Sequence, residues 1–424
     1  MNARAAKALG WKWVAGLWLA GTLLAGQANA DAGLQQAEAQ FATWREALWG
    51  EAQAAGVSRA TFDGALANVS LDWSLPDLEP PGAAAPERQQ AQQAEFGSPG
   101  RYFSESNISI LVSRGRAERD RRRADLLAIE RRYGVPHQIL LAIWGRETAY
   151  GSVNIPHDAI RTLATQAFMG RRAAFFRTQL IAALKLLHEG HGSREELRSS
   201  WAGAMGHTQM LPTHFLQYGV DFDGDGRRNV WNSVPDALAA TAHFLAENGW
   251  QSDLPWGYEV RLPAGADCTL EGPHQGRPFA EWMAMGYERT RNRNWPAGRH
   301  ATTGYLLMPA GQYGPAFLVT DNFYVLKAYN ESDLYALYVG HVADRLDNDR
   351  PFEGRWGNVS TYPRSDVKSL QNVLVANGYN VGDTIDGLVG FRTRTAVGLY
   401  QRKNDLTVDC WPGPETFGQA RREG

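Results

Sequence analysis

Residues 136–151 read PHQILLAIWGRETAYG, which is the pattern of a buried helix carrying one acidic side chain. Apolar residues recur there at helical spacing, and Glu147 falls on the same face, four residues after Ile143 and three after Trp144. Burial raises the pKa of a carboxyl, and an acid that is protonated near neutral pH suits general acid catalysis. A second interpretation stays open, in which Glu147 pairs with an arginine such as Arg146 or faces solvent at the helix end.

The length and composition of the chain are those of a globular protein with more than one domain. Of its 424 residues, 44% are hydrophobic and 21% are charged. These fractions are ordinary for a folded protein, and the length is sufficient for a large core. The formal net charge of −2 lacks the basic excess typical of nucleic-acid-binding proteins. We therefore expect no nucleic-acid partner.

Residues 1–30 have the pattern of a secretory signal peptide. A basic start is followed by an apolar run over 13–24 and by small residues over 28–30, so cleavage is expected before Asp31. The apolar run is short for a membrane span, and Gln27 stands where a lipoprotein would need a cysteine. We expect a protein that is exported to the periplasm, with neither a membrane span nor a lipid anchor.

Helical patterns dominate the remainder of the chain. A long charged helix is expected over 106–133, an amphipathic helix over 171–188, and further helices over 322–329 and 332–346. Residues 255–317 show short alternating segments and turns instead, and this change of pattern predicts a small β-containing insertion.

The last part of the chain is expected to be a small, separate piece. Residues 349–364 contain Pro, Gly and polar residues, as a linker does. Residues 365–424 then show helix, turn and helix, followed by a proline-containing close. About 60 residues are enough for a binding module, and few of them have the chemistry of a catalytic group.

An acidic loop follows the Gln209 region and has the spacing of a calcium site. Asp221, Asp223 and Asp225 stand at alternate positions, with a glycine sixth, as at the start of an EF-hand loop. The twelfth position is Asn232 rather than Glu, so Asp236 would have to close a longer loop. Asp236 could instead cap the following helix, and the loop could be an Asp-Gly turn without a metal.

Only two cysteines occur, Cys268 and Cys410. An exported protein can form a disulfide, but the sequence does not show whether these two residues lie close together. Neither cysteine has the neighbours of a metal or nucleophile motif, so a bridge and two free thiols both stay open.

Taken together and in order, four motifs resemble the lytic murein transglycosylases of the B family. They are IWGRETAYG at 143–151, SWAGAMGHTQMLP at 200–212, VDFDGDGRRNVWNSVPDA at 220–237 and NFYVLKAYNES at 322–332. The resemblance covers approximately residues 41–346. A second resemblance, to the three-helix type of peptidoglycan-binding domain, is carried by SLQNVLVANGY at 369–379 and DGLVG at 386–390, although Phe391 replaces the usual proline.

These resemblances imply the roles of individual residues. Glu147 would be the single catalytic acid and base. The substrate-binding residues implied are Ser200, Gln209, Met210, Tyr329, Asn330 and Tyr335. A structural calcium ion would be held by Asp221, Asp223, Asp225, the backbone carbonyl of Arg227, and Asp236.

The resemblances also imply a fold and an activity. The fold is mainly α, with a lysozyme-like helical catalytic domain (31–348) that includes the β-containing insertion, a linker (349–364) and a three-helix binding domain (365–424). The implied reaction cleaves the β-1,4 bond between N-acetylmuramic acid and N-acetylglucosamine in peptidoglycan strands and leaves 1,6-anhydromuramic acid ends. A hydrolytic, lysozyme-type muramidase and a noncatalytic peptidoglycan-binding protein are the alternatives.

Overall fold

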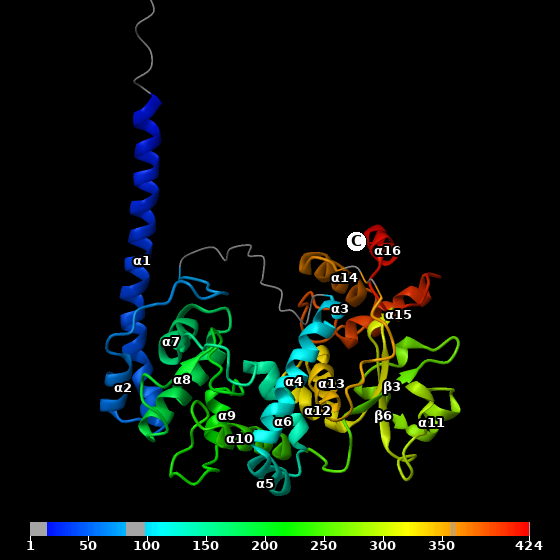
Figure 1. Cartoon of the computed structure of the whole chain (residues 1–424). Helices are drawn as coiled ribbons and strands as arrows, with labels where there is room; N and C mark the ends of the chain where they lie inside the picture. Colours follow the sequence, from blue (N-terminus) through cyan, green and yellow to red (C-terminus); the bar gives the residue numbers. More distant parts are fainter. Residues whose placement is uncertain (1–14, 82–97, 358, 360, 424) are drawn as a thin grey trace, which may run out of the picture. The chain divides into compact units, whose positions relative to one another are not determined.

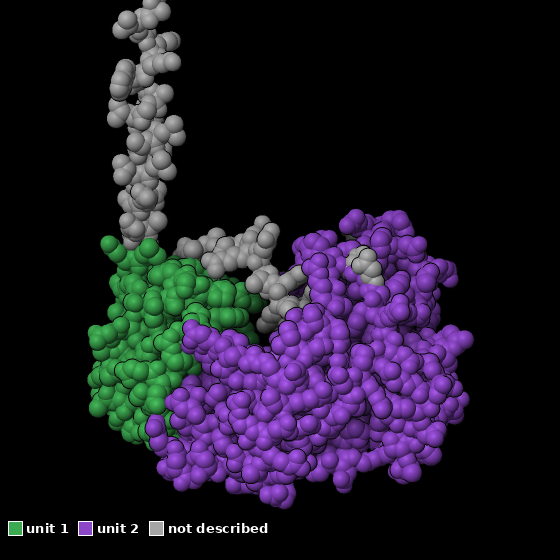
Figure 2. All heavy atoms as spheres, viewed as in Figure 1, with its two compact units in different colours: residues 1–88, 156–204, 211–213 green, residues 89–155, 205–210, 214–424 purple. Residues whose placement is uncertain are grey.

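A computed structural model describes residues 15–81, 98–357, 359 and 361–423, with the backbone alone over 15–33. The chain divides into two compact units, coloured separately in Figure 2. Unit 1 comprises residues 1–88, 156–204 and 211–213, and unit 2 comprises the remainder. The basic start of the expected signal peptide lies outside the described residues.

Among the described residues, unit 1 contains the helices α1, α2, α7 and α8 and a short two-stranded sheet (Figure 1). The helices α7 and α8 pack against each other, and α1 and α2 pack on α8. Strands β1 and β2 pair antiparallel. Its elements are α1 (Ala15–Ala54), α2 (Arg59–Leu66), β1 (His157–Asp158), α7 (Ala159–Met169), α8 (Ala173–His188) and β2 (Arg198–Ser199). The helix expected over 171–188 is therefore confirmed. No helix in the described part of the chain is both long and apolar enough to cross a membrane.

The helical half of unit 2 surrounds α6, the helix that carries Glu147. Helices α4, α5, α10 and α13 all pack against α6. Residues 139–145 of α6 are buried without interruption, so the helix is apolar on every side and not only on one face. The helices concerned are α3 (Pro99–Tyr102), α4 (Glu105–Arg121), α5 (Arg123–Tyr133), α6 (His137–Thr148), α10 (Val234–Glu247), α12 (Asp321–Tyr329) and α13 (Asp333–Asn348). A further short helix is α9 (Pro212–Tyr218).

The single long helix expected over 106–133 is wrong, because the structure breaks it at Arg122. That residue has φ −113° and ψ 21°, outside the helical range. Its guanidinium donates a hydrogen bond to Glu118 and lies over the ring of Trp144, 5.4 Å from the centroid. The break thus directs Arg122 onto the buried helix α6, a tertiary contact that helical periodicity alone does not reveal.

The expected β-containing insertion is confirmed as a five-stranded antiparallel sheet in the order β4-β6-β8-β3-β5. Its strands are β3 (Gly257–Arg261), β4 (Arg277–Pro278), β5 (Glu288–Arg289), β6 (Thr303–Leu307) and β8 (Ala316–Val319). Strand β7 (Pro309–Gln312), helix α11 (Phe279–Ala284) and the 3-10 turns η2 (Cys268–Leu270), η3 (Pro273–Gln275) and η4 (Thr290–Asn292) complete this region. The core of the insertion contains Trp282, Tyr287 and Leu318.

The C-terminal residues form three helices with a core of their own, but belong to unit 2. The helices are α14 (Arg364–Ala376), α15 (Phe391–Lys403) and α16 (Pro414–Glu423). A disulfide joins Cys268 of the insertion to Cys410, with Cα atoms 6.1 Å apart, which settles the question left open by the sequence. The C-terminal piece therefore has its own core, as expected, but it is not a separate body, because the disulfide attaches it covalently to the insertion.

A buried ion network strengthens this attachment. The guanidinium of Arg394 on α15 contacts the carboxylates of Glu271 and Asp333 at 2.7 and 2.9 Å, and Lys327 contacts Asp333 at 2.6 Å. Arg394 is 3% exposed and Glu271 is fully buried. Since charges removed from water are stable only when paired, this network holds α15 in one position against the insertion and α13.

The segment expected to be a linker is irregular but firmly held. The backbone amides of Glu353 and Gly354 donate hydrogen bonds to the carboxylate of Glu259, at 3.0 and 2.7 Å. Phe352 and Trp356 pack against the main core of unit 2. Its linker-like composition thus coexists with fixed contacts over residues 352–356.

Candidate active site

Glu147 is the penultimate residue of α6 and is half-buried. The helix ends directly after it, because Ala149 and Tyr150 take left-handed conformations with φ 47° and 60°. Such conformations are costly for residues with a side chain and persist where surrounding contacts enforce them. The Tyr150 hydroxyl, for example, donates to the Leu111 carbonyl at 2.9 Å. The carboxylate therefore stands at the end of a rigid, buried helix.

Tyr335 of α13 contacts this carboxylate directly. Its hydroxyl donates a hydrogen bond of 2.5 Å to Oε1 of Glu147, and its side chain is only 2% exposed. Burial, and then the negative charge of Glu147, raise the pKa of the Tyr335 hydroxyl well above its usual value. The phenol therefore keeps its proton and remains a donor. A donated hydrogen bond of this kind orients the carboxylate and stabilises its ionised form.

Arg146, proposed from the sequence as an alternative partner of Glu147, is directed to aromatic rings. Its Nε donates to the Tyr102 hydroxyl at 3.1 Å, and its guanidinium lies 5.0 Å from the centroid of the Tyr102 ring. It also lies over Tyr338, at 5.5 Å. Burial lowers the pKa of Arg146, but the contacts with Tyr102 and the charge of Glu147 outweigh this effect and leave it raised.

The loop Met205–Met210 lies beside these groups in unit 2. Its ends are joined by two backbone hydrogen bonds of 2.9 Å between Met205 and Met210. Tyr329 donates to the Thr208 carbonyl at 2.6 Å, and burial followed by the charge of Glu147 raises the pKa of Tyr329. Gln209 is half-buried with φ 54°, and its side-chain amide donates to the Gly206 carbonyl at 3.1 Å. Tyr329 thus contacts the loop Met205–Met210, and Tyr335 contacts Glu147.

His207 of the same loop holds the end of α6 and was missed by the sequence analysis. The Trp144 indole donates to His207 Nδ1 at 3.2 Å, and the Thr148 hydroxyl donates to the His207 carbonyl at 2.7 Å. Gly151, at φ 76°, leaves no room for a side chain, since a Cβ would lie 2.7 Å from the imidazole. Burial, and then Arg122, lower the pKa of His207. It is the one titratable side chain in SWAGAMGHTQMLP, which is the signal that could have identified it.

The other expected substrate-binding residues have mainly backbone contacts. The Ser200 hydroxyl accepts from the amides of Ala202 and Ala204, within unit 1, at 3.3 and 3.2 Å. Met210 is 2% exposed. Asn330 follows α12 and accepts from the Ser332 amide at 3.0 Å. Contact of Ser200, Gln209, Met210, Tyr329, Asn330 or Tyr335 with a substrate stays a prediction.

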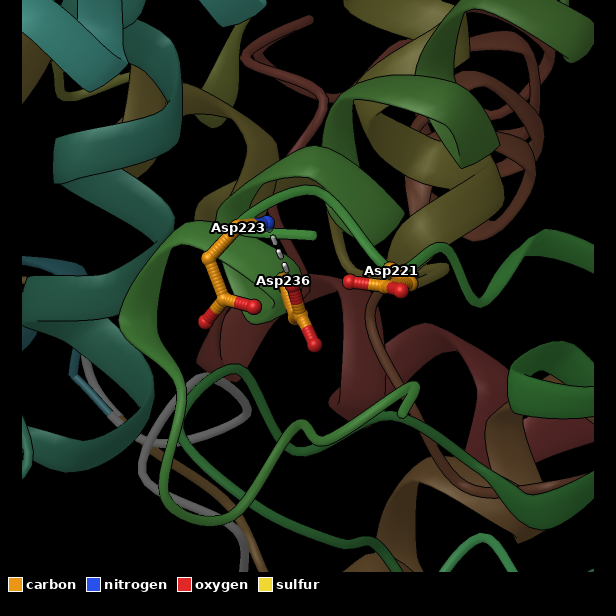
Figure 3. Close-up of side chains that lie close together, drawn as sticks. All are labelled: Asp221, Asp223 and Asp236. Carbon is orange, nitrogen blue, oxygen red and sulfur yellow. Dashed lines mark hydrogen bonds between the residues drawn. The ribbon is translucent and has the colours of Figure 1, made fainter. Parts of the chain in front are cut away.

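The acidic loop brings three of its carboxylates together (Figure 3). Carboxylate oxygens of Asp221, Asp223 and Asp236 lie within 4.8 Å of one another. Asp225 is exposed and its carboxylate accepts from the Arg227 amide at 2.8 Å, outside this cluster. The donor set of the cluster is hard oxygen, which fits calcium.

Asp236 organises this loop as well as contributing an oxygen to it. Its Oδ1 accepts from the amides of Phe222 and Asp223 at 2.7 and 3.3 Å, and its Oδ2 accepts from the Asn229 amide at 2.9 Å. Burial raises its pKa in spite of these hydrogen bonds. The cap of α10 is Ser233 rather than Asp236, since the Ser233 hydroxyl accepts from the Asp236 amide at 3.3 Å. The helix-cap alternative for Asp236 is therefore wrong.

Comparisons with known proteins define the family. A family model described as "Transglycosylase SLT domain" matches residues 40–344, and one described as "Putative peptidoglycan binding domain" matches residues 363–419. The first match spans more than half of the chain, which therefore belongs to this family of lytic transglycosylases. The expected mainly helical, lysozyme-like fold with a C-terminal binding domain is confirmed.

Individual relatives agree with this assignment. SltB3 from Pseudomonas aeruginosa, solved in complex with NAG-NAM-pentapeptide, is 39% identical over 90% of this chain and 99% of its own, with a TM-score of 0.81. Slt35 from Escherichia coli, solved in complex with calcium, is 27% identical over 61% of this chain and 81% of its own, with a TM-score of 0.51. Membrane-bound lytic murein transglycosylase B of Escherichia coli K12 is 31% identical over 217 residues, and the chain spans 58% of its length.

Proposed function

We propose that this protein is a lytic murein transglycosylase that cleaves the β-1,4 bond between N-acetylmuramic acid and N-acetylglucosamine and forms 1,6-anhydromuramic acid ends. The observation that carries this proposal is Glu147, which is fixed at the end of α6 by the Tyr335 hydroxyl. The 39% identity to SltB3, which was solved with a NAG-NAM-pentapeptide, supports peptidoglycan strands as the substrate.

The chemistry needs one group that first gives and then takes a proton. Protonated Glu147 donates to the glycosidic oxygen as the bond to the muramic acid anomeric carbon breaks, while the substrate's own acetamido group supports the positive charge. The ionised carboxylate then accepts the proton of the muramoyl C6 hydroxyl as that oxygen bonds to the anomeric carbon. Glycosidases that use water commonly need two carboxylates, whereas here the sugar supplies the nucleophile. Tyr335 keeps the carboxylate in place in both steps.

The test is product analysis of purified peptidoglycan. The wild type is expected to release anhydromuropeptides, which are lighter by one water than the products of a hydrolytic muramidase. Glu147→Gln is expected to lose activity by about 10²- to 10⁴-fold, the contribution of a positioned acid and base. The exposed Glu195→Gln is the matched control and should retain full activity. Reducing sugar ends in the wild-type products would favour hydrolysis, and an absence of all products would favour a noncatalytic binding protein.

We also propose that the acidic loop holds a structural calcium ion. The convergent oxygens of Asp221, Asp223 and Asp236 and the calcium complex of Slt35 support this assignment. Asp225 and the Arg227 carbonyl would complete the ligand set. When bound, the ion would neutralise these carboxylates and fix the loop between α9 and α10; it has no part in the proton transfers above.

The remaining assignments concern location and boundaries. The signal-peptide pattern and a periplasmic substrate favour an exported protein with a leader over 1–30. The domain limits proposed are 31–348 for catalysis, 349–364 for the connecting segment and 365–424 for peptidoglycan binding. Gln209, Met210, Tyr329 and Asn330 of unit 2 are proposed to contact the glycan beside Glu147, and Ser200 of unit 1 is proposed as a further substrate-binding residue.

A further inference from the structure

A cavity in unit 2 lies between the insertion and the end of α13. Its volume is about 180 Å³. Three arginines of the β5–η4 segment line it, namely Arg289, Arg291 and Arg293, together with Arg350 from the segment after α13. A cavity of this volume can accommodate the charged group at one end of a small molecule.

This cavity is distinct from the site around Glu147. Asp344 lines it from α13, nine residues after Tyr335. At 100° and 1.5 Å per residue, nine residues place the two side chains on opposite faces of the helix and about 13 Å apart along its axis. Gly340 of the same helix permits Trp256 to lie against the helix backbone, since a Cβ there would come within 2.6 Å of the indole. Trp256 thereby forms part of the cavity wall.

The arginines of the cavity have an acidic neighbour there, Asp344, whose charge attracts Arg289 and Arg293. Arg289 stacks on Tyr258, 4.3 Å from the ring centroid, and donates to the Asn294 carbonyl at 2.7 Å. Its buried Nε has no hydrogen-bond partner among the described atoms. Arg289 and Arg293 line the same cavity. Burial, and then repulsion from Arg293, lower the pKa of Arg289. Guanidinium groups that line one cavity favour a carboxylate there, because each can donate charge-assisted hydrogen bonds to it.

Two acids line the cavity, Glu259 and Asp344, and of these only Asp344 is available to a ligand. The carboxylate of Glu259 is occupied by the amides of Glu353 and Gly354 and by the Thr290 hydroxyl. Asp344 is exposed to solvent and lines the same cavity as the arginines. A bound cation would favour its ionised form.

From the Arg289 and Arg293 pair and the facing Asp344, we infer that this cavity binds an α-amino-acid head group, whose carboxylate contacts the arginines and whose ammonium contacts Asp344. A simple anion fits less well, because Asp344 repels it. A simple cation fits less well, because the arginines repel it. His341, which also lines the cavity, is neutral there, since burial lowers its pKa to about 3.

The test uses the full chain and three probes of similar size, measured by calorimetric titration or by NMR. Alanine carries both charges, propionate lacks the ammonium and ethylammonium lacks the carboxylate. Alanine is expected to bind saturably and at least about 10-fold more tightly than propionate, as expected for one added hydrogen-bonded charge. Equal binding of propionate would show a plain anion site, and no saturable binding of alanine would show no site; either result overturns the inference.

Variants locate the binding. Asp344→Asn should abolish the preference for alanine over propionate, whereas Arg289→Ala should weaken both ligands. The exposed Arg293→Ala keeps the test valid if Arg289→Ala fails to fold. Arg421→Ala, exposed on α16, is the control and should change nothing. Alanine binding that is unchanged in both Asp344→Asn and Arg293→Ala would place the ligand elsewhere. Glu147→Gln should bind alanine as the wild type does, which separates this site from turnover.

The head group could come from a free amino acid or from the side chain of a peptide. Nε-acetyl-lysine presents an intact α-amino-acid head at the end of an amide-bearing chain, whereas Nα,Nε-diacetyl-lysine keeps the carboxylate but has no ammonium. Binding of the first but not the second would support a peptide-borne head group. Binding of alanine without Nε-acetyl-lysine would support the free amino acid. Equal binding of both lysine derivatives would contradict recognition of the ammonium and overturn the inference.

Discussion

The hydroxyl of Tyr335 donates a 2.5 Å hydrogen bond to Oε1 of Glu147, joining residues that are 188 positions apart in the chain. The bond connects the end of α6 to the first turn of α13, and both helices are buried in the same core. This hydrogen bond fixes the orientation of the Glu147 carboxylate, which the position of Glu147 at a helix end would not do by itself. Four predictions follow from this and from other contacts in the structure.

Tyr335→Phe is expected to lower kcat by about 10- to 100-fold, since a hydrogen bond to a charged group is worth about 1.5–3 kcal/mol. KM should change little, because the phenol contacts Glu147 and its side chain is only 2% exposed. The measurement is steady-state turnover of purified peptidoglycan, with melting temperatures to confirm folding. Tyr338→Phe, one turn further along α13, is the matched control. Equal activity of wild type and Tyr335→Phe would show that the hydrogen bond has no role in catalysis.

The stability of the protein should fall as the pH decreases below 6.5, partly through His341. This imidazole is 4% exposed and stacks on Phe352 with ring centroids 3.7 Å apart, and burial lowers its pKa to about 3. Between pH 6.5 and 3 the unfolded chain therefore binds a proton that the folded chain does not, so acid favours unfolding. His341 should account for about 2 kcal/mol between pH 6.5 and 4.5.

The check is denaturant unfolding at both pH values. His341→Phe should show a smaller loss of stability than the wild type, whereas His300→Phe, at an exposed position, should show the same loss. An identical pH dependence in wild type and His341→Phe would contradict this assignment.

Removal of calcium is expected to lower the melting temperature. A metal that binds only the folded state stabilises it by about 2.7 kcal/mol at 100 times its Kd. Titration with EGTA should therefore shift the melting curve down, and added calcium should restore it. Asp223→Ala should melt like the chelated protein, while Asp383→Asn, an exposed control, should respond like wild type. An unchanged curve, together with no metal detected by elemental analysis, would remove the calcium assignment.

Arg394→Ala is expected to destabilise the protein by about 3–5 kcal/mol, because it leaves Glu271 charged, buried and unpaired. Arg402 offers a control on the same helix, since it pairs with Asp267 at 2.7 Å while 51% exposed. Loss of that surface pair should cost about 0–1 kcal/mol. Denaturant unfolding of both variants measures the difference. Similar losses in the two would mean that the buried network does not fix the C-terminal helices.

The sequence predicted the acid-bearing helix and the mainly helical fold because both depend on local pattern. The spacing of Ile143, Trp144 and Glu147 predicted a buried helix, and the structure buries α6 on every side. The alternating segments of the insertion became strands for the same reason. His207 was missed because its importance depends on Trp144 and Thr148, which meet it only in the folded chain.

What the sequence by itself determined is therefore the identity of the elements and the presence of one acid on a buried helix. The tertiary structure decided which distant groups meet: Tyr335 with Glu147, Cys268 with Cys410, and Arg394 with Glu271. The physical reason is that periodicity and capping act over a few residues, whereas a hydrogen bond, a disulfide or a buried ion pair depends on a distance in space. Many packings share the same local pattern, and only the complete core selects one of them.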